Sequence, residues 1–274
     1  IPIAPFLLLF GAKLAFTLWE WAQRARGSPA GALARPILVA VFALALGGTA
    51  FYAVSYLGVY NDPHPAVAAS NWINANVREN SVILKEHWEE GLPAMGDYRV
   101  RELPLYEPDT PAKLSTIAGE LAKADYLVLF SNRLYGTIPR LQERYPISQE
   151  YYRLLFTGQL GYELAEQFAS YPELLGVGFV DETFSRPGLP EPVALARLDG
   201  PTVPLNLGFA DESFSVYDHP KVLVFRNALQ LGPEVISARI LDSSTGFPRQ
   251  SIGSRKADPG GGRLLLSTED ARAQ

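Results

Sequence analysis

The chain has 274 residues with 24 Lys+Arg, 29 Asp+Glu and no Cys, which gives a formal net charge of -5. This acidic balance, without a dense block of Lys and Arg, argues against nucleic-acid binding, which needs cations to neutralise phosphates. The lack of cysteine in the sequence excludes a disulfide scaffold, a Cys-ligated metal site and a thiol nucleophile.

Two apolar segments precede the rest of the chain. Residues 1–22 are apolar apart from Lys13 and Glu20, and residues 36–60 carry no charged side chain. A membrane-spanning helix needs about 20 predominantly apolar residues, so we expect both segments to cross a membrane. The chain begins with Ile1 inside an apolar run, which predicts that it is a fragment of a longer protein.

The connection between these segments, residues 23–35, contains three Arg and no acidic residue. Short Arg-rich loops remain cytoplasmic, so we predict a multi-pass protein of the cell membrane with everything after Tyr60 on the extracytoplasmic side. A charge in the middle of a span is costly. Lys13 therefore indicates either further helices packed around it or a side chain that reaches the interface.

Residues 61–228 show the pattern of an α/β domain. Asp62 followed by Pro is typical of a helix start, and residues 81–88 (SVILKEHW) predict a buried strand. Thr110 followed by Pro predicts the next helix, and residues 125–131 (DYLVLFS) predict a second strand. A strand–helix–strand order in one sheet implies parallel neighbouring strands with a right-handed crossover.

The pattern weakens toward the end of this domain. Ser148 is expected to cap a helix that ends at Gly158, and residues 162–168 alternate as in a strand. Residues 172–211 are rich in Pro and Gly, which predicts a long irregular excursion on the surface.

Residues 213–227 contain two short β-like runs around Asp218 and His219. We predict an antiparallel hairpin or a bent edge strand there, and we favour a turn over a catalytic dyad for the Asp-His-Pro sequence. Residues 229–274 are expected to form a flexible tail or linker. The predicted fold is therefore two transmembrane helices followed by an extracytoplasmic α/β domain, whose sheet is mainly parallel with an antiparallel edge.

The residues that follow the two predicted parallel strands are the candidates for a binding site. Glu86, His87 and Trp88 follow the first strand, and Arg133 and Tyr135 follow the second. Ligands of open α/β sheets bind outside the carboxyl ends of strands, so both groups are expected to line one crevice. An Arg can grip a phosphate or carboxylate, a Glu or His can exchange protons or hydrogen-bond a sugar, and a Trp can stack on a sugar ring. The alternative that we favour is purely structural: these side chains cap the strands and join the two loops.

We expect no metal site and no cofactor. The three His, at His64, His87 and His219, have no second His or Cys at ligand spacing. The sequence contains no G-x-S-x-G, P-loop or G-x-G-x-x-G motif.

Several segments together resemble a known family. The sequences EHWEEGLP, SNRLYG and YDHPKVLVF, within roughly Val41 to Asn227, are similar to the C-terminal region of bacterial family 39 glycosyltransferases. These are multi-span membrane enzymes related to protein mannosyltransferases and aminoarabinose transferases. The final residues RLLLSTEDARAQ are similar to the junction with a YYY-motif membrane domain in some relatives.

The resemblance implies a sugar donor linked to polyprenyl phosphate, and an extracytoplasmic domain that caps the active site or helps to bind the substrate. The catalytic acid of that family lies in the first extracytoplasmic loop of the full enzyme, and no residue here corresponds to it, so no catalytic residue is expected in this chain. The implied partners are the lipid bilayer, the lipid-phosphate-linked sugar and missing N-terminal transmembrane helices of the same protein. The alternative is a non-catalytic, membrane-anchored binding or scaffold module.

Overall fold

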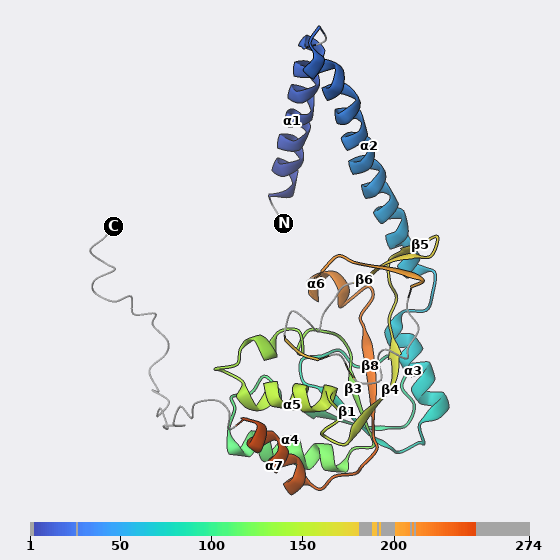
Figure 1. The fold of residues 1–274 in the computed structure, drawn as a ribbon. Helices are drawn as coiled ribbons and strands as arrows, with labels where there is room; N and C mark the ends of the chain where they lie inside the picture. Colours follow the sequence, from blue (N-terminus) through green and yellow to red (C-terminus); the bar gives the residue numbers. More distant parts are fainter. Residues whose placement is uncertain are drawn as a thin grey trace, which may run out of the picture.

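The molecule consists of a helical hairpin joined to an α/β domain (Figure 1). The computed structural model describes residues 3–25, 27–180, 188–190, 192, 201–208, 210 and 212–244. The long helices form an arm on one side of the domain, and the turn between them is the point farthest from the domain (Figure 1).

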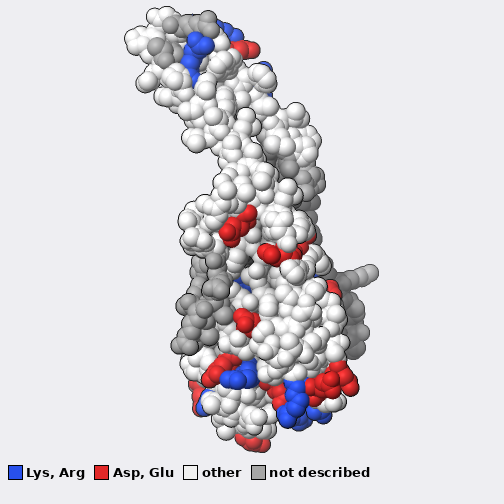
Figure 2. Space-filling view, turned by 90° about the vertical axis from the view of Figure 1, so that its right-hand side faces the viewer, with Lys and Arg blue, Asp and Glu red and all other residues white. Residues whose placement is uncertain are grey.

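The arm is formed by α1 (Ala4–Arg24) and α2 (Pro29–Leu57). Among the described residues, one helical segment, beginning at Leu33, is long and apolar enough to cross a membrane by length and composition. This finding supports membrane association, whereas the crossing by α1 stays a prediction. The arm in Figure 2 is free of charged side chains between its tip and the domain on the face shown.

The helix that contains the predicted second span starts earlier than residue 36. Helix α2 begins at Pro29 and passes through Pro36, so the connecting turn is shorter than the predicted loop of residues 23–35. A proline suits the first helical turn, and the intervening Ala-rich residues have high helix propensity.

After α2, a 3₁₀ turn, η1 (Gly58–Tyr60), leads to α3 (Pro65–Asn76). The predicted cap at Asp62 is wrong: His64 caps α3, and its Nδ1 accepts the backbone N–H of Ala66 at 3.2 Å. Because a residue before proline is disfavoured in the helical region, the helix starts only at Pro65, the last of the closely spaced prolines.

The domain is built on a five-stranded mixed sheet with the order β2-β1-β3-β8-β4. Strands β2 (Arg99–Leu103), β1 (Val82–Glu86) and β3 (Tyr126–Leu129) are parallel, which confirms the predicted strand–helix–strand unit. Strand β8 (Val222–Asn227) is antiparallel to β3 and to β4 (Tyr162–Phe168). Three parallel strands therefore continue into an antiparallel half of the sheet.

Helices cover both faces of this sheet. Helices α4 (Pro111–Lys123), α5 (Pro146–Phe156) and α7 (Pro233–Ser244) contribute to the larger core on one face, together with Leu84 and Phe225 of the sheet. Helix α3 closes the other face, where its buried side chains join those of β1, β3 and β8.

Two predictions about helix starts have different outcomes. The N-cap at Thr110 is confirmed, since its Oγ1 accepts the backbone N–H of Lys113 at 3.1 Å. Ser148 is not a cap, because α5 already starts at Pro146 with Tyr145 at the N-cap. The short 3₁₀ helix η2 (Ile138–Arg140) lies between β3 and α5.

The region predicted as irregular contains a second sheet of three strands with the order β5-β6-β7. Its strands are β5 (Glu173–Leu174), β6 (Val177–Val180) and β7 (Val203–Asn206).

The predicted hairpin of residues 213–227 is wrong in two respects. Its first half is the helical turn α6 (Glu212–Ser215), and its second half, β8, lies inside the sheet rather than at its edge. An almost uninterrupted apolar run is typical of a strand that is covered on both faces. The predicted tail is wrong for residues 233–244, which form α7, and its residues 245–274 lie outside the described residues.

Candidate functional site

Three loops meet at one edge of the main sheet, which we call the upper edge. Strands β1 and β3 are parallel neighbours and both end there, as the pairing of Lys85 with Val128 shows. Strand β8 runs in the opposite direction and begins there, where Leu223 pairs with Leu129. The loops after β1 and β3 and the turn before β8 are therefore brought together, as expected for the carboxyl ends of parallel strands.

Arg133 joins these three loops. Its Nη1 donates to the backbone carbonyl of Trp88 at 3.0 Å, and its Nη2 donates to the Tyr217 hydroxyl at 3.2 Å. Its backbone N–H donates to Oγ of Ser131 at 3.1 Å. The guanidinium also lies 5.8 Å from the centre of the Tyr217 ring, within the range of a cation–π contact. The predicted proximity of Trp88 and Arg133 is thus present in the structure.

An open cleft of about 460 Å³ lies beside this arginine. Its lining combines three aromatic rings, two guanidinium groups and one carboxylate: Trp88, Tyr106, Glu107, Arg133, Arg144 and Tyr145. Guanidinium groups bind phosphate through paired charged hydrogen bonds, and aromatic faces accept the apolar face of a sugar ring. The cleft can therefore accommodate an anionic sugar derivative.

The backbone of Trp88 is strained. Its φ is 75°, in the left-handed region that bulky residues rarely adopt, and the side chain is 65% exposed at the cleft. Strain of this kind persists only where the surrounding structure imposes it, and here Arg133 holds the Trp88 carbonyl.

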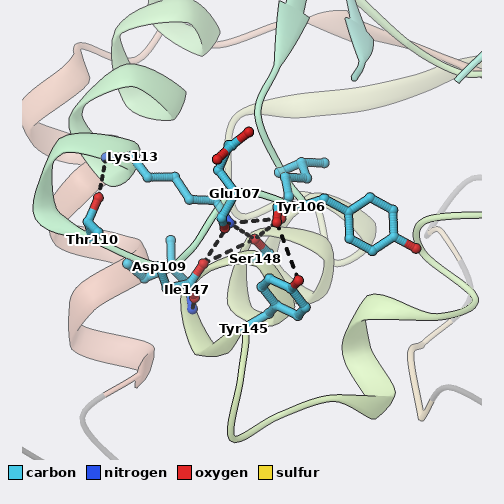
Figure 3. A network of polar contacts seen from close by, with 9 residues as sticks. Tyr106, Glu107, Asp109, Thr110, Lys113, Tyr145, Ile147 and Ser148 are labelled. Atoms are coloured by element: carbon cyan, nitrogen blue, oxygen red, sulfur yellow. Dashed lines mark hydrogen bonds and ion pairs between the residues drawn. The ribbon is translucent and has the colours of Figure 1, made fainter. Parts of the chain in front are cut away.

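A buried lysine supports the opposite wall of the cleft (Figure 3). The ammonium group of Lys113 donates to the carbonyls of Leu105 and Glu107 at 2.8 and 2.7 Å, to Oδ1 of Asp109 at 2.6 Å and to Oγ of Ser148 at 2.7 Å. Burial lowers the pKa of Lys113, and the adjacent carboxylate of Asp109 opposes this change.

This network fixes the two segments that form the wall. The Tyr145 hydroxyl donates to the carbonyl of Tyr106 at 3.3 Å, and the backbone N–H of Ile147 donates to Asp109 (Figure 3). The loop after β2 and the start of α5 are thereby held against each other, so Lys113 positions the wall without lining the cleft.

Glu86 and Tyr135, both predicted as site residues, do not line the cleft. Each is fully buried. Oε1 of Glu86 accepts the Tyr152 hydroxyl at 2.6 Å, while its Oε2 has no hydrogen-bond partner among the described residues. Burial, and then the charge of Glu89, raises the pKa of Glu86 well above its usual value, which favours the neutral carboxyl. Tyr135 packs edge-on against Phe156 in the core.

His87 is held by a carboxylate on β2. Its Nδ1 lies 2.7 Å from Oε2 of Glu102, and Lys85 lies 3.0 Å from Oε1 of the same carboxylate. The hydrogen bonds from these two residues lower the pKa of Glu102, and the bond with His87 has the larger effect. The His87 ring also contacts the Trp88 ring edge-on at 5.1 Å. His87 thus contacts strand β2 and the neighbouring Trp88.

The turn before β8 connects the cleft to the arm. The hydroxyls of Tyr56 and Tyr60, at the end of α2 and in η1, donate to the two oxygens of Asp218 at 3.0 and 3.2 Å. Nε2 of His64 lies 3.0 Å from the carbonyl of Tyr217, the residue that also contacts Arg133. Asp218 thus acts in a turn, as we favoured, and this turn ties the upper edge to α2.

Sequence reasoning missed all four residues of the far wall, Tyr106, Glu107, Arg144 and Tyr145. The signal that could have found them is the Tyr-Glu pair that follows a short charged strand and the Arg-Tyr pair that precedes the proline at the start of α5. Neither pair shows from the sequence alone that it faces Trp88.

Comparisons with protein-family models, with curated proteins and with solved structures found no match. Among the described residues, no group of three or more His, Cys, Asp or Glu could hold a metal ion.

Proposed function

We propose that this chain is the C-terminal part of a membrane glycosyltransferase, and that the upper-edge cleft binds the headgroup of a sugar donor linked to polyprenyl phosphate. The observation that carries the proposal is the pairing of two guanidinium groups with three aromatic rings in one cleft, at the edge tied to α2. In this proposal the domain binds and caps the substrate, while the catalytic acid comes from another part of the protein.

The chemistry of the cleft suits a sugar phosphate. Both terminal nitrogens of Arg133 donate hydrogen bonds, one to Trp88 and one to Tyr217, which fixes the plane of its guanidinium, whereas Arg144 contacts the Tyr145 ring at 5.1 Å. One ordered and one adjustable guanidinium can close on a phosphate. The exposed ring of Trp88 lies at the same cleft and can stack on the sugar.

The position of the cleft favours a donor that is anchored in lipid. Tyr217, which contacts Arg133, is followed directly by Asp218, which binds the end of α2. A headgroup held by Arg133 would lie near the membrane end of the domain.

The proposal includes the topology. Arg24 ends α1 at the turn between α1 and α2, and this turn is the point farthest from the domain (Figure 1), an arrangement that supports two spans with the domain on the extracytoplasmic side. The partners would be the bilayer and further transmembrane helices of the same protein. Lys13 would face these helices.

The test is donor binding by Arg144→Ala, measured with the protein in phosphatidylcholine nanodiscs and a short-chain polyprenyl-phosphate hexose. A charged hydrogen bond contributes about 1.5–3 kcal/mol, and a tenfold change in affinity corresponds to about 1.4 kcal/mol, so binding should weaken about tenfold or more. The matched control is Arg78→Ala, an exposed arginine before β1 at the other edge of the sheet.

Three results of this experiment would count against the proposal. Equal affinities of the Arg144 and Arg78 variants would refute phosphate binding in the cleft. Equal binding of the same hexose on a phosphate-free polyprenol would also refute it. A wild-type protein that binds neither compound would favour the membrane-anchored scaffold module.

A further inference from the structure

The small sheet β5-β6-β7 lies across the lower end of α2 (Figure 1). The ring of Phe179 on β6 is 6.0 Å from that of Phe51 and 4.9 Å from that of Tyr52, both on α2. The backbone of β5 also approaches η1, directly after α2: a Cβ on Gly58 would lie 2.8 Å from the carbonyl oxygen of Glu173. The sheet is therefore packed directly against the helix.

The face that touches α2 continues beyond the helix as an apolar surface. Val203 is in register with Val177, and Leu205 is in register with Phe179, and side chains in register lie on the same face of a sheet. Val203 and Leu205 remain 49% and 43% exposed, and Leu207 at the end of the strand is 66% exposed. Side chains of the same face as Phe179 thus meet whatever medium surrounds α2.

The turn between β5 and β6 adds a fourth exposed apolar side chain. Leu175 has φ 54° and is followed by Gly176 with φ 80°. Such a turn is normally made by Asn-Gly or Asp-Gly, because two successive positive φ angles suit those residues. Leucine is strained in this backbone conformation, and its side chain is 90% exposed. Neither the backbone conformation nor contact with water therefore favours leucine at this position.

The depth of these contacts along α2 identifies the medium. From Phe51 to the end of α2 at Leu57 the helix rises only about 9 Å, at 1.5 Å per residue. The rings of Phe51 and Tyr52 belong to the uncharged stretch of α2 that is long enough to cross a membrane. When α2 crosses a membrane, residues packed beside these rings would lie at the level of the boundary between lipid headgroups and acyl chains.

We infer that Leu175, Val203, Leu205 and Leu207 form a collar that inserts into the bilayer surface on the side of the domain. The acidic side chains near this level, among them Asp62 and Glu173, are exposed, and the charges nearest the arm on the face in Figure 2 are acidic. The collar therefore binds by apolar insertion rather than by attraction to anionic headgroups.

The collar gives the domain a second attachment to the membrane. A domain attached by a single helix can rotate about the helix axis and tilt relative to the membrane. A sheet face inserted beside the helix would fix both the rotation and the tilt of the domain. The inference depends on a membrane-crossing α2 and is independent of the identity of the ligand in the cleft.

The experiment uses single cysteines, which is straightforward because the sequence has no native cysteine. Leu175→Cys and Leu207→Cys are labelled with a fluorophore in the full chain, in nanodiscs of pure phosphatidylcholine with or without lipids that carry a nitroxide near the top of the acyl chain. Leu44→Cys, 76% exposed on α2, is the control within the membrane. Leu229→Cys, 61% exposed after the far end of β8, is the control in water.

The inference requires nitroxide quenching of the labels at Leu175 and Leu207 to approach that at Leu44 and to exceed that at Leu229 several-fold. Quenching at both positions no greater than at Leu229, while the label at Leu44 is quenched, would overturn it. A further Leu205→Asp substitution should lower the quenching at Leu175 and leave that at Leu44 unchanged. An unchanged signal at Leu175 would also count against insertion.

Discussion

The buried network around Lys113 predicts a large loss of stability for Lys113→Met. The side chain is 3% exposed and that of Asp109 is 7% exposed, and the ammonium is within 2.8 Å of four oxygen atoms. Methionine preserves most of the aliphatic volume and removes the charge and all donors. The carboxylate of Asp109 would then remain in the interior without its cation.

Removal of one partner from a buried ion pair costs about 3–5 kcal/mol, because the other charge remains desolvated. Since a typical domain is stable by about 5–15 kcal/mol, we expect Lys113→Met to remove a large fraction of the free energy of unfolding. The same change should release the wall of the cleft, because the carbonyl of Glu107 loses its donor.

Urea unfolding of the full chain in detergent, followed by tryptophan fluorescence, measures this loss. With an m-value of about 2 kcal/mol/M, a loss of about 4 kcal/mol lowers the midpoint by about 2 M. The matched control is Lys123→Met, at the exposed end of the same helix, which should change the midpoint only slightly. Midpoints of the two variants that agree within about 0.5 M would refute the reasoning.

Two further predictions concern a buried acid and a close helix contact. Because burial raises the pKa of Glu86 above 4.5, the folded state binds more protons than the unfolded state, and stability should fall as pH rises through the raised pKa. In thermal unfolding between about pH 4 and about pH 8, Glu86→Gln should flatten this slope, and the exposed control Glu163→Gln should retain it. Gly58→Ala would place a Cβ 2.8 Å from the Glu173 carbonyl oxygen and should cost about 1–3 kcal/mol. The control Gly47→Ala meets nothing within 4 Å, so equal melting temperatures for the two alanine variants would contradict the close contact.

The elements predicted correctly are those specified by local signals. Strands β1 and β3 are short apolar runs, and Thr110 before a proline specifies the start of α4. The parallel order of the two strands follows from the handedness of a strand–helix–strand connection, without knowledge of the rest of the domain. Local signals were therefore sufficient for the unit that places Trp88 and Arg133 together.

The missed elements depend on tertiary contacts. Strand β2 reads RVREL, and four of its five residues are exposed, so only pairing with β1 identifies it as a strand. The small sheet is hidden by its prolines and glycines and takes its place against α2 through Phe179. Helix α7 packs on α4 and α5. The pattern of apolar residues in its own sequence does not predict these contacts.

For the same reason, the sequence predicted only the wall of the cleft that contains Trp88 and Arg133. Trp88 and Arg133 follow strands whose ends are brought together by the sheet, so their proximity could be expected. Tyr106 and Tyr145 come from the loop after β2 and from the start of α5, and they meet because Lys113 holds both segments. A wall fixed by one buried lysine cannot be found by patterns of apolar residues.

The turn before β8 determines how the cleft and the arm are related. Tyr217 contacts Arg133, and Asp218, the next residue, accepts hydrogen bonds from Tyr56 and Tyr60. Adjacent Cα atoms are about 3.8 Å apart, so the cleft cannot move far from α2 without breaking one of these contacts. A freely diffusing ligand could reach the cleft whatever its position relative to α2, so these contacts would not affect its binding. In the proposed function, a headgroup anchored in lipid would be presented at a fixed height, where a cleft held on α2 would meet it.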